Sequence, residues 1–255
     1  MSMTVIEQVR KQRPLIHNIT NGVVMNFVAN GLLAFGGSPI MANASEEVED
    51  VTRLSNGLLL NIGTLTETQV KAMILAGKAA NETGIPVVLD PVGVAATSYR
   101  SKVCERILEE VQPTVIKGNT GELAHLAGIE VEIKGVDSTG SGNMEDIVQR
   151  VSEKYQTGAV CTGVKDVVWI DGESKVNHSG HPLLSQITGS GCLLGSLVAA
   201  ALAVDGKPLE NVTATLRSYG EAAEKVAAHK EVEGPGTFLP RFIDALAMEG
   251  SGGDS

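Results

Sequence analysis

Short apolar runs alternate with longer segments of helical periodicity along almost the whole chain. The apolar runs have the length of buried strands, and the segments between them repeat apolar residues at helical spacing, as residues 66–83 do with Val70, Met73 and Ile74. This alternation predicts βαβ units, and therefore an α/β fold with a mainly parallel central sheet and helices on both faces. The expected strands lie at residues 15–17, 38–41, 58–61, 87–90, 114–117, 159–162 and 167–170.

The pattern changes after the seventh of these runs. Residues 167–170 and 174–177 flank Asp171-Gly172, a dipeptide that favours tight turns, and they predict a β-hairpin. Helices are expected to follow at 190–204, 208–231 and 237–248. Because no shift in composition marks a second unit, we expect one domain over residues 1–249, ending in a disordered tail at 250–255.

Charge and composition exclude several kinds of partner. A net charge of −10 and only eight aromatic residues disfavour nucleic acid. The longest apolar stretch, residues 191–204, is shorter than the roughly 20 residues that cross a bilayer, so no membrane partner is expected. Three cysteines and an N-terminus without an apolar signal region favour reduced thiols in the cytoplasm.

Polar residues and glycines follow six of the expected strands. His17, Met41, Asn61, Asp90 and Thr162 stand at or near such ends, and residues 117–119 form another. Each is most simply an ordinary turn residue. Six of them at one edge of a parallel sheet indicate a ligand site, because open α/β sheets bind ligands outside the carboxyl ends of their strands.

The strongest local pattern is Gly189-Ser190-Gly191-Cys192, which opens an almost wholly apolar helix. A helix that is apolar all round is buried, so its N-terminal N–H groups and positive dipole end lie in a protected space. The glycines let an anion approach this backbone. Cys192 is either a buried packing residue or, because it lies at a helix N-terminus, a thiol with enhanced thiolate character.

A second pattern joins carboxylates to strand ends. Glu122 follows Asn119 by three residues, a spacing that fits a helix cap as well as a functional carboxylate. Asp90 ends an apolar strand before Pro91. Asp90 and Glu122 could orient water on Mg²⁺, as carboxylates in phosphoryl-transfer sites do. We expect Cys104, Cys161 and His125 to be packing or surface residues.

Taken together, these motifs resemble the ribokinase-like superfamily of small-molecule kinases, and within it the hydroxyethylthiazole kinase family. The resemblance extends from about residue 9 to residue 246. It is carried by the Asn119 to Glu122 motif, the Gly-x-Gly helix start and residues 14–34, 37–42, 60–65, 88–93, 116–119 and 234–238.

The resemblance implies ATP-dependent phosphorylation of the hydroxyl of 4-methyl-5-(2-hydroxyethyl)thiazole for thiamine synthesis or salvage, with Mg²⁺, in a cytoplasmic homotrimer whose sites lie between subunits. It implies that the thiazole is bound by Met41, Asn21 and Gly189, and ATP by Lys117, Thr162 and Asn119. It further implies that the transferring phosphoryl group meets Gly189, Ser190 and Gly191, with Cys192 in the place of the usual base and Asp90 and Glu122 guiding the metal. The scarcity of aromatic residues adds the expectation that aliphatic side chains and backbone hold the adenine.

Two positions depart from the family pattern, in which arginine usually stands at 117 and alanine at 190. Lys117 keeps the positive charge of arginine but cannot form its two parallel hydrogen bonds to a phosphate.

Three other functions are alternatives to the thiazole kinase. One is another ribokinase-like enzyme, such as a hydroxymethylpyrimidine or sugar kinase or a dehydratase. The others are a nucleotide-binding protein without catalysis and a thiol enzyme that uses Cys192 as nucleophile.

Overall fold

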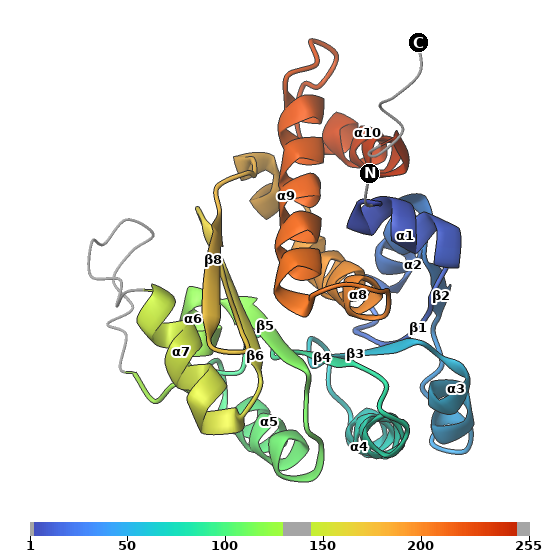
Figure 1. The fold of residues 1–255 in the computed structure, drawn as a ribbon, viewed down its shortest axis with the longest axis vertical. Helices are drawn as coiled ribbons and strands as arrows, with labels where there is room; N and C mark the ends of the chain where they lie inside the picture. Colours follow the sequence, from blue (N-terminus) through green and yellow to red (C-terminus); the bar gives the residue numbers. More distant parts are fainter. Residues whose placement is uncertain (1–2, 130–143, 249–255) are drawn as a thin grey trace.

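The computed structural model describes residues 3–129 and 144–248. Its described strands form one sheet in the order β2-β1-β3-β4-β5-β6-β7-β8 (Figure 1). Their bounds are β1 Leu15–Ile19, β2 Ser38–Ile40, β3 Gly57–Asn61, β4 Val87–Asp90, β5 Val115–Asn119, β6 Gly158–Thr162, β7 Asp166–Ile170 and β8 Glu173–Asn177.

The sheet is mainly parallel, as predicted. Neighbouring strands from β2 to β6 run parallel, and β7 and β8 add an antiparallel hairpin beside β6. Asp171 and Gly172 both have positive φ, 54° and 80°. Positive φ at both central residues is what a type I′ turn requires, so the predicted hairpin is confirmed together with its turn.

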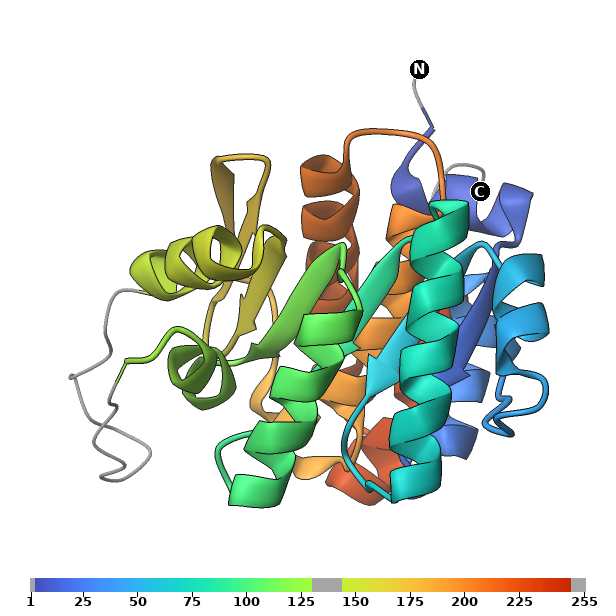
Figure 2. The same ribbon diagram turned by 90° about the horizontal axis from the view of Figure 1, so that it is seen from below.

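Helices cover both faces of the sheet, which confirms the predicted class (Figure 2). One face packs against α1 (Val5–Gln12), α2 (Met25–Phe35), α8 (Ser190–Leu202), α9 (Pro208–Ala227) and α10 (Pro235–Met248). The other packs against α3 (Val48–Leu54), α4 (Glu67–Thr83), α5 (Ser98–Glu110), α6 (Thr120–Leu126) and α7 (Met144–Tyr155). A short 3₁₀ helix, η1 (Pro182–Gln186), precedes α8.

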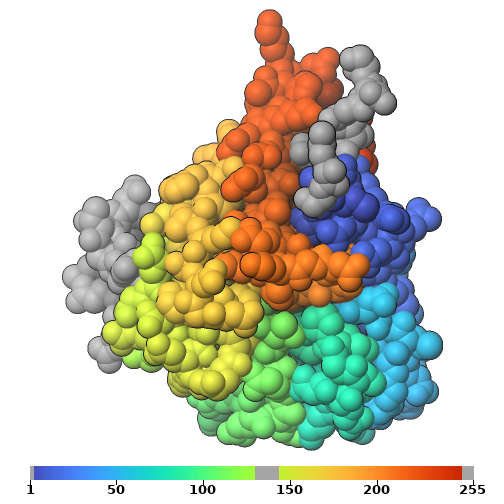
Figure 3. All heavy atoms as spheres, viewed as in Figure 1, coloured from blue at the N-terminus to red at the C-terminus, as the bar shows by residue number. Residues whose placement is uncertain are grey.

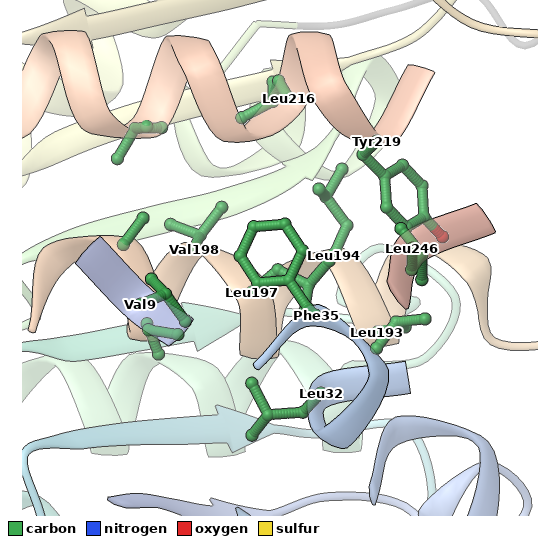
Figure 4. Close-up of a cluster of buried hydrophobic side chains, with 14 of the residues drawn as sticks. Val9, Leu32, Phe35, Leu193, Leu194, Leu197, Val198, Leu216, Tyr219 and Leu246 are labelled. Atoms are coloured by element: carbon green, nitrogen blue, oxygen red, sulfur yellow. The ribbon is translucent and has the colours of Figure 1, made fainter. Parts of the chain in front are cut away.

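Helix α8 lies at the centre of its layer. All ten of its residues from Cys192 to Ala201 are buried. In Figure 4, Leu193, Leu197 and Val198 of α8 lie among side chains from α1, α2, α9 and α10. The hydrophobic effect of burying this many aliphatic side chains is the main force that holds α8 against the sheet. It thereby also sets the position of the first turn of α8.

Helices α1 and α10, the first and last helices that the structure describes, are joined by hydrogen bonds. Arg10 of α1 donates hydrogen bonds to the carbonyls of Leu246 and Ala247 at 3.0 and 2.7 Å, and Figure 3 shows the blue N-terminal part beside the orange and red C-terminal helices. No helix within the described ranges is long and apolar enough to cross a membrane. The predicted tail at 250–255 lies outside the described residues.

Element bounds differ from the prediction mainly at the ends. β1 continues to Ile19 and β5 to Asn119, while α8 ends at Leu202 and α9 at Ala227. The sequence pattern gave no bounds for α1, α2, α3 and α7. These helices are short or, like α2, carry apolar residues that also suit a buried strand.

Candidate active site

The carboxyl ends of the parallel strands bring the predicted polar residues together beside the N-terminus of α8. Asn61 and Asp90 end adjacent strands and are register partners, as are Asn119 and Thr162 on β5 and β6. Side-chain hydrogen bonds join several of these positions to one another and to α8. The edge of the sheet that the sequence indicated as a ligand site is therefore a connected polar cluster.

The first turn of α8 is open to an incoming group. Gly189 is the N-cap, has φ of 91° and makes no side-chain cap bond. A Cβ at Gly189 would lie 2.4 Å from Val24 Cγ1, so only glycine fits both the φ and the space. The N–H groups of this turn have no partner within the helix and carry its positive dipole end. The predicted glycine-rich start of α8 is thus present, and anion binding there stays a prediction.

Two contacts hold this turn in place. The Ser190 hydroxyl donates to the carbonyl of Leu184 at 2.7 Å, which ties α8 to η1. The Tyr219 hydroxyl of α9 donates to the carbonyl of Ser190 at 2.8 Å. Ser190 therefore offers its backbone to a ligand, while its side chain is engaged in the fold.

Lys117 and Asp90 form an ion pair beneath the turn. Lys117 Nζ lies 3.4 Å from Asp90 Oδ1 and donates to the Gly191 carbonyl at 2.9 Å. Their side chains are only 4% and 1% exposed. Burying either charge alone would cost several kcal/mol, so each charge requires the other. The ammonium adds positive potential at the N-terminus of α8.

The charge state of this pair follows from burial and mutual attraction. Burial raises the pKa of Asp90 to about 6, against the opposing effect of Lys117. Burial alone would lower the pKa of Lys117, but the charges of Asp90 and Glu122 hold it above its ordinary value. Each charge therefore favours the ionised form of the other.

A chain of amides connects this pair to Cys192. Asn61 Nδ2 donates to Asp90 Oδ2 at 2.8 Å, and Asn21 Nδ2 donates to Asn61 Oδ1 at 2.9 Å. Asn21 Nδ2 also lies 3.5 Å from Cys192 Sγ. Asn61 therefore links the charged side of the site to the thiol. The sequence placed Asn61 only at a strand end, although its position beside the expected strand of Asp90 was a signal for this role.

Cys192 differs from expectation in its charge. It is 9% exposed. Burial and the charge of Asp90 raise its pKa, while Lys117 and hydrogen bonds with Asn61 and Asn21 partly oppose this. The expectation that the helix N-terminus favours the thiolate is therefore wrong, because desolvation of the sulfur outweighs the nearby positive charge. Cys192 is a neutral thiol at neutral pH.

Glu122 makes three hydrogen bonds, two within the cap of α6 and one to the segment after β4. Asn119 and Glu122 form the capping box of α6, with Asn119 Oδ1 accepting from Glu122 N and Glu122 Oε2 accepting from Asn119 N, both at 2.9 Å. Glu122 Oε1 accepts from Gly93 N at 2.8 Å in the segment after β4. The capping interpretation is confirmed, and Glu122 also links α6 to the strand end of Asp90.

The carboxylates fit a metal that arrives with a ligand better than a metal held by protein alone. Within the described residues no group of three His, Cys, Asp or Glu side chains could hold an ion. Asp90 and Glu122 nevertheless interact electrostatically across the site. Two carboxylates with oxygen lone pairs to spare suit Mg²⁺, which keeps several waters and takes its other ligands from phosphates.

The remaining predicted residues line the same edge. Thr162 ends β6, and its hydroxyl donates to the carbonyl of Gly118 at 3.3 Å. Met41 follows β2, is half-buried and packs on the cluster that contains α8. Thr20, next to Asn21, has a buried hydroxyl with no partner among the described residues. Thr20 belongs to the segment 14–34 that carries the family resemblance, but the sequence pattern predicted no role for its side chain.

The other two cysteines and His125 lie outside the chain of hydrogen bonds that joins Asp90, Asn61, Asn21 and Cys192. All three cysteines are free, and Cys104 and Cys161 are buried in the opposite layer, as expected for packing residues. Burial raises their pKa values to about 12 and about 11. His125 is exposed, and its Nε2 lies 3.2 Å from the Ser101 hydroxyl.

Comparison with known proteins agrees with this geometry. Similar folds include a ribokinase-like superfamily protein from Enterococcus faecalis, with 12% identity, a TM-score of 0.66 and coverage of 91% of this chain and 86% of that one. The mostly parallel sheet, with helices on both faces and a glycine-rich helix start at the sheet edge, defines a ribokinase-like fold.

The particular family follows from closer matches. The model of the hydroxyethylthiazole kinase family matches residues 6–249. A hydroxyethylthiazole kinase from Oceanobacillus iheyensis is 56% identical over 97% of this chain and 96% of its own length. The solved hydroxyethylthiazole kinase of Pyrococcus horikoshii is 40% identical, with a TM-score of 0.86 over 95% of this chain and 91% of that one. The chain belongs to the hydroxyethylthiazole kinase family and is a kinase.

Proposed function

We propose that this enzyme transfers the γ-phosphoryl group of ATP to the hydroxyl of 4-methyl-5-(2-hydroxyethyl)thiazole, giving the thiazole phosphate used to make thiamine phosphate. The observation that carries the proposal is the first turn of α8, where Gly189 and Gly191 open a dipole end onto the ion pair of Lys117 and Asp90. The choice of the thiazole alcohol as the substrate rests on membership of the family.

The first turn of α8 supports stabilisation of the transferring group. Phosphoryl transfer proceeds through a loose transition state, so positioning and charge stabilisation dominate catalysis. The backbone N–H groups of residues 189–191 and the Lys117 ammonium provide fixed positive potential that needs no reorganisation during the reaction. Lys117 acts from beneath the turn, through its bond to Gly191, and also neutralises Asp90.

We place the nucleotide and its metal on the side of the site that lies away from Cys192, at the ends of β5 and β6. Thr162 and Asn119 stand at adjacent strand ends on the side of the phosphate position away from Cys192, and with Lys117 they are our candidates for contacts to ATP. Asp90 and Glu122 would hold Mg²⁺ through its waters. When bound, Mg²⁺ neutralises phosphate charge. The chain's own contribution is to keep both carboxylates fixed by Asn61 and by the backbone of Gly93 and Asn119.

Cys192 is our candidate for the group that meets the substrate hydroxyl. A neutral thiol is a weak proton acceptor, and the loose transition state demands little of a base. Its sulfur can accept the hydrogen bond of the hydroxyl and direct the oxygen toward the phosphoryl group. Asn21, which contacts the same sulfur, together with Met41 and Gly189 would border the neutral heterocycle.

Assembly and location extend this proposal. The exposed apolar side chains of Val23 and Leu33, 69% and 56% exposed, lie beside Asn21 and along α2. Such side chains near a site rim suit a subunit interface. We propose a cytoplasmic homotrimer with sites between subunits, and light scattering after size exclusion would measure its mass.

A substrate panel tests the function. ATP consumption is measured with the hydroxyethylthiazole and with hydroxymethylpyrimidine, each with and without Mg²⁺. We expect ATP to be consumed in only one of these mixtures, the one that contains both the thiazole and Mg²⁺. Preference for the pyrimidine would assign a different ribokinase-like activity. ATP binding without product from either alcohol would indicate a nucleotide-binding protein without catalysis.

A further inference from the structure

Arg100, near the start of α5, donates three hydrogen bonds to backbone carbonyls in two different loops. Its Nη1 donates to Ile62 O at 2.6 Å and to Val92 O at 2.8 Å, and its Nη2 donates to Gly63 O at 2.6 Å. Ile62 and Gly63 follow β3, whereas Val92 follows β4. One half-buried guanidinium therefore joins the two chain segments that leave the sheet at Asn61 and Asp90.

The segment after β3 borders the thiol side of the site. A Cβ at Gly63 would lie 2.5 Å from Asn21 Nδ2, so the amide of Asn21 packs directly on this backbone. Gly63 N also donates to Asn61 Oδ1 at 3.0 Å. The position of Gly63 thus fixes both amides that connect Cys192 to Asp90.

The segment after β4 borders the carboxylate side. Gly93 has φ of 67°, and its N–H donates to Glu122 Oε1 at 2.8 Å. A Cβ at Gly93 would lie 3.7 Å from Arg100 Cδ, which places the arginine stem alongside this peptide. Through Val92, the guanidinium holds the peptide that orients Glu122.

We propose that Arg100 is a positioning residue for the kinase reaction: it locks the segments after β3 and β4 together, so that Asn21 and Glu122 keep fixed places on either side of the first turn of α8. The inference rests on the proposed function for the reaction that it serves. Arg100 touches neither Cys192 nor Asp90, so its effect passes through the two loop backbones.

Arginine suits this position for a geometric reason. Its planar fork presents several donors in fixed directions, and here they reach carbonyls from two loops at once. A lysine ammonium is a point charge on a flexible stem and lacks the fixed fork that spans both loops. Loosening the loops by about 1 Å is enough to slow a positioned reaction strongly.

The test compares Arg100→Ala and Arg100→Lys with Arg106→Ala. Arg106 lies on the same helix, but its partners are the side chains of Glu67 and Glu110 on the surface. Steady-state kcat and KM for ATP and the thiazole are measured, together with hydrogen exchange of the amides at residues 61–64 and 91–94. The exchange measurement needs no activity.

We expect Arg100→Ala to lower kcat by at least about tenfold, with each KM changed less than about threefold, and to speed exchange in both segments. Arg100→Lys should recover only part of kcat. Arg106→Ala should leave kcat within about twofold and exchange unchanged.

Wild-type kcat or unchanged exchange in Arg100→Ala would overturn the proposal, as would an equal loss of kcat in Arg106→Ala. If Arg100→Ala does not fold, Arg100→Lys decides by the same criteria, and wild-type values there overturn it. Failure of the wild-type enzyme to phosphorylate the thiazole would refute the proposed function instead. The exchange comparison would still test the connection between the loops.

Discussion

At the scale of single residues, the site places its charged side chains beside a neutral thiol. Lys117 and Asp90 carry the charges, deep and paired, while Cys192 stays neutral beside them. Both outcomes follow from burial: a pair of opposite charges can be kept ionised in a desolvated place, whereas a thiol with no full counter-charge of its own is kept protonated.

Cys192→Asp tests the role of the thiol. Because a carboxylate accepts the same hydrogen bond from the substrate hydroxyl more strongly than a neutral thiol does, we expect substantial kinase activity in this variant. Measured kcat with the thiazole and ATP checks it, with Cys192→Ala as the matched variant that lacks an acceptor and should be slower. A folded Cys192→Asp protein without activity would contradict a hydrogen-bond acceptor at this position.

His17 gives a prediction for pH. It is fully buried, with Nε2 2.8 Å from the Ala42 carbonyl and Nδ1 2.8 Å from Thr52 Oγ1. Burial lowers its pKa, and the bond to Ala42 partly opposes this. A base whose pKa is lowered by folding destabilises the native state when it must be protonated. Its contribution is therefore favourable above the unfolded pKa near 6.5 and is lost as the pH falls below it.

Urea unfolding between pH 7.5 and pH 5 measures this effect. We expect the free energy of unfolding to fall less steeply in His17→Gln than in the wild type, by about 1.4 kcal/mol for each unit of pKa lowering. His125→Gln, which alters an exposed histidine, should keep the wild-type slope. Identical slopes in the wild type and His17→Gln would show that His17 does not couple protonation to folding.

At the scale of elements, helix termini carry the site. Helix α8 presents its N-terminus to the phosphate position that we propose, and α6 begins with a capping box whose glutamate lies at the same edge of the sheet. The same capping device occurs in α1, where Thr4 and Glu7 form it far from the site. The two helices therefore allow stability and function to be separated.

Glu122→Ala and Glu7→Ala form this matched pair. Each removes the glutamate half of a capping box, an acidic side chain in the first turn of its helix, so each should lower the free energy of unfolding by about 0.3–1 kcal/mol. Only Glu122→Ala also removes a site carboxylate and releases Gly93, so only it should lower kcat, by at least about tenfold. Denaturant unfolding and steady-state kinetics check both. Equal kcat values in the two variants would show that Glu122 caps α6 and has no role in catalysis.

Strand–helix alternation, the hairpin turn and the buried helix α8 could be predicted because each depends on local pattern. The site residues at strand ends could be predicted because parallel strands share one carboxyl edge. Asn61 and Arg100 could not be assigned roles. Asn61 acts through contacts with Asn21 and Asp90 from distant segments, and Arg100 binds carbonyls 37 and 38 residues away in sequence. The neutral state of Cys192 also depends on burial, which only packing determines.

At the scale of the whole molecule, an acidic chain can serve an anionic nucleotide because positive potential is local. The net charge is −10, yet the Lys117 ammonium and the dipole end of α8 border the phosphate position that we propose. A single domain over residues 1–249 stays a prediction, as do the trimer and the aliphatic adenine site.

The central claim is that the α8 N-terminus stabilises the transferring phosphoryl group.

Single-turnover transfer of phosphate from labelled ATP to the thiazole in Gly191→Val tests this claim most directly. Gly191 lies in α8 without a positive φ, and among the described residues, leaving out its chain neighbours and its own helix backbone, the atom within 4 Å of a Cβ there is Lys117 Nζ, at 3.4 Å; Gly189→Val would instead add backbone strain and a clash with Val24. We predict a folded Gly191→Val protein that transfers phosphate at least about a hundredfold more slowly than the wild type, because its side chain blocks the approach to the backbone. Transfer at a near-normal rate would contradict the claim.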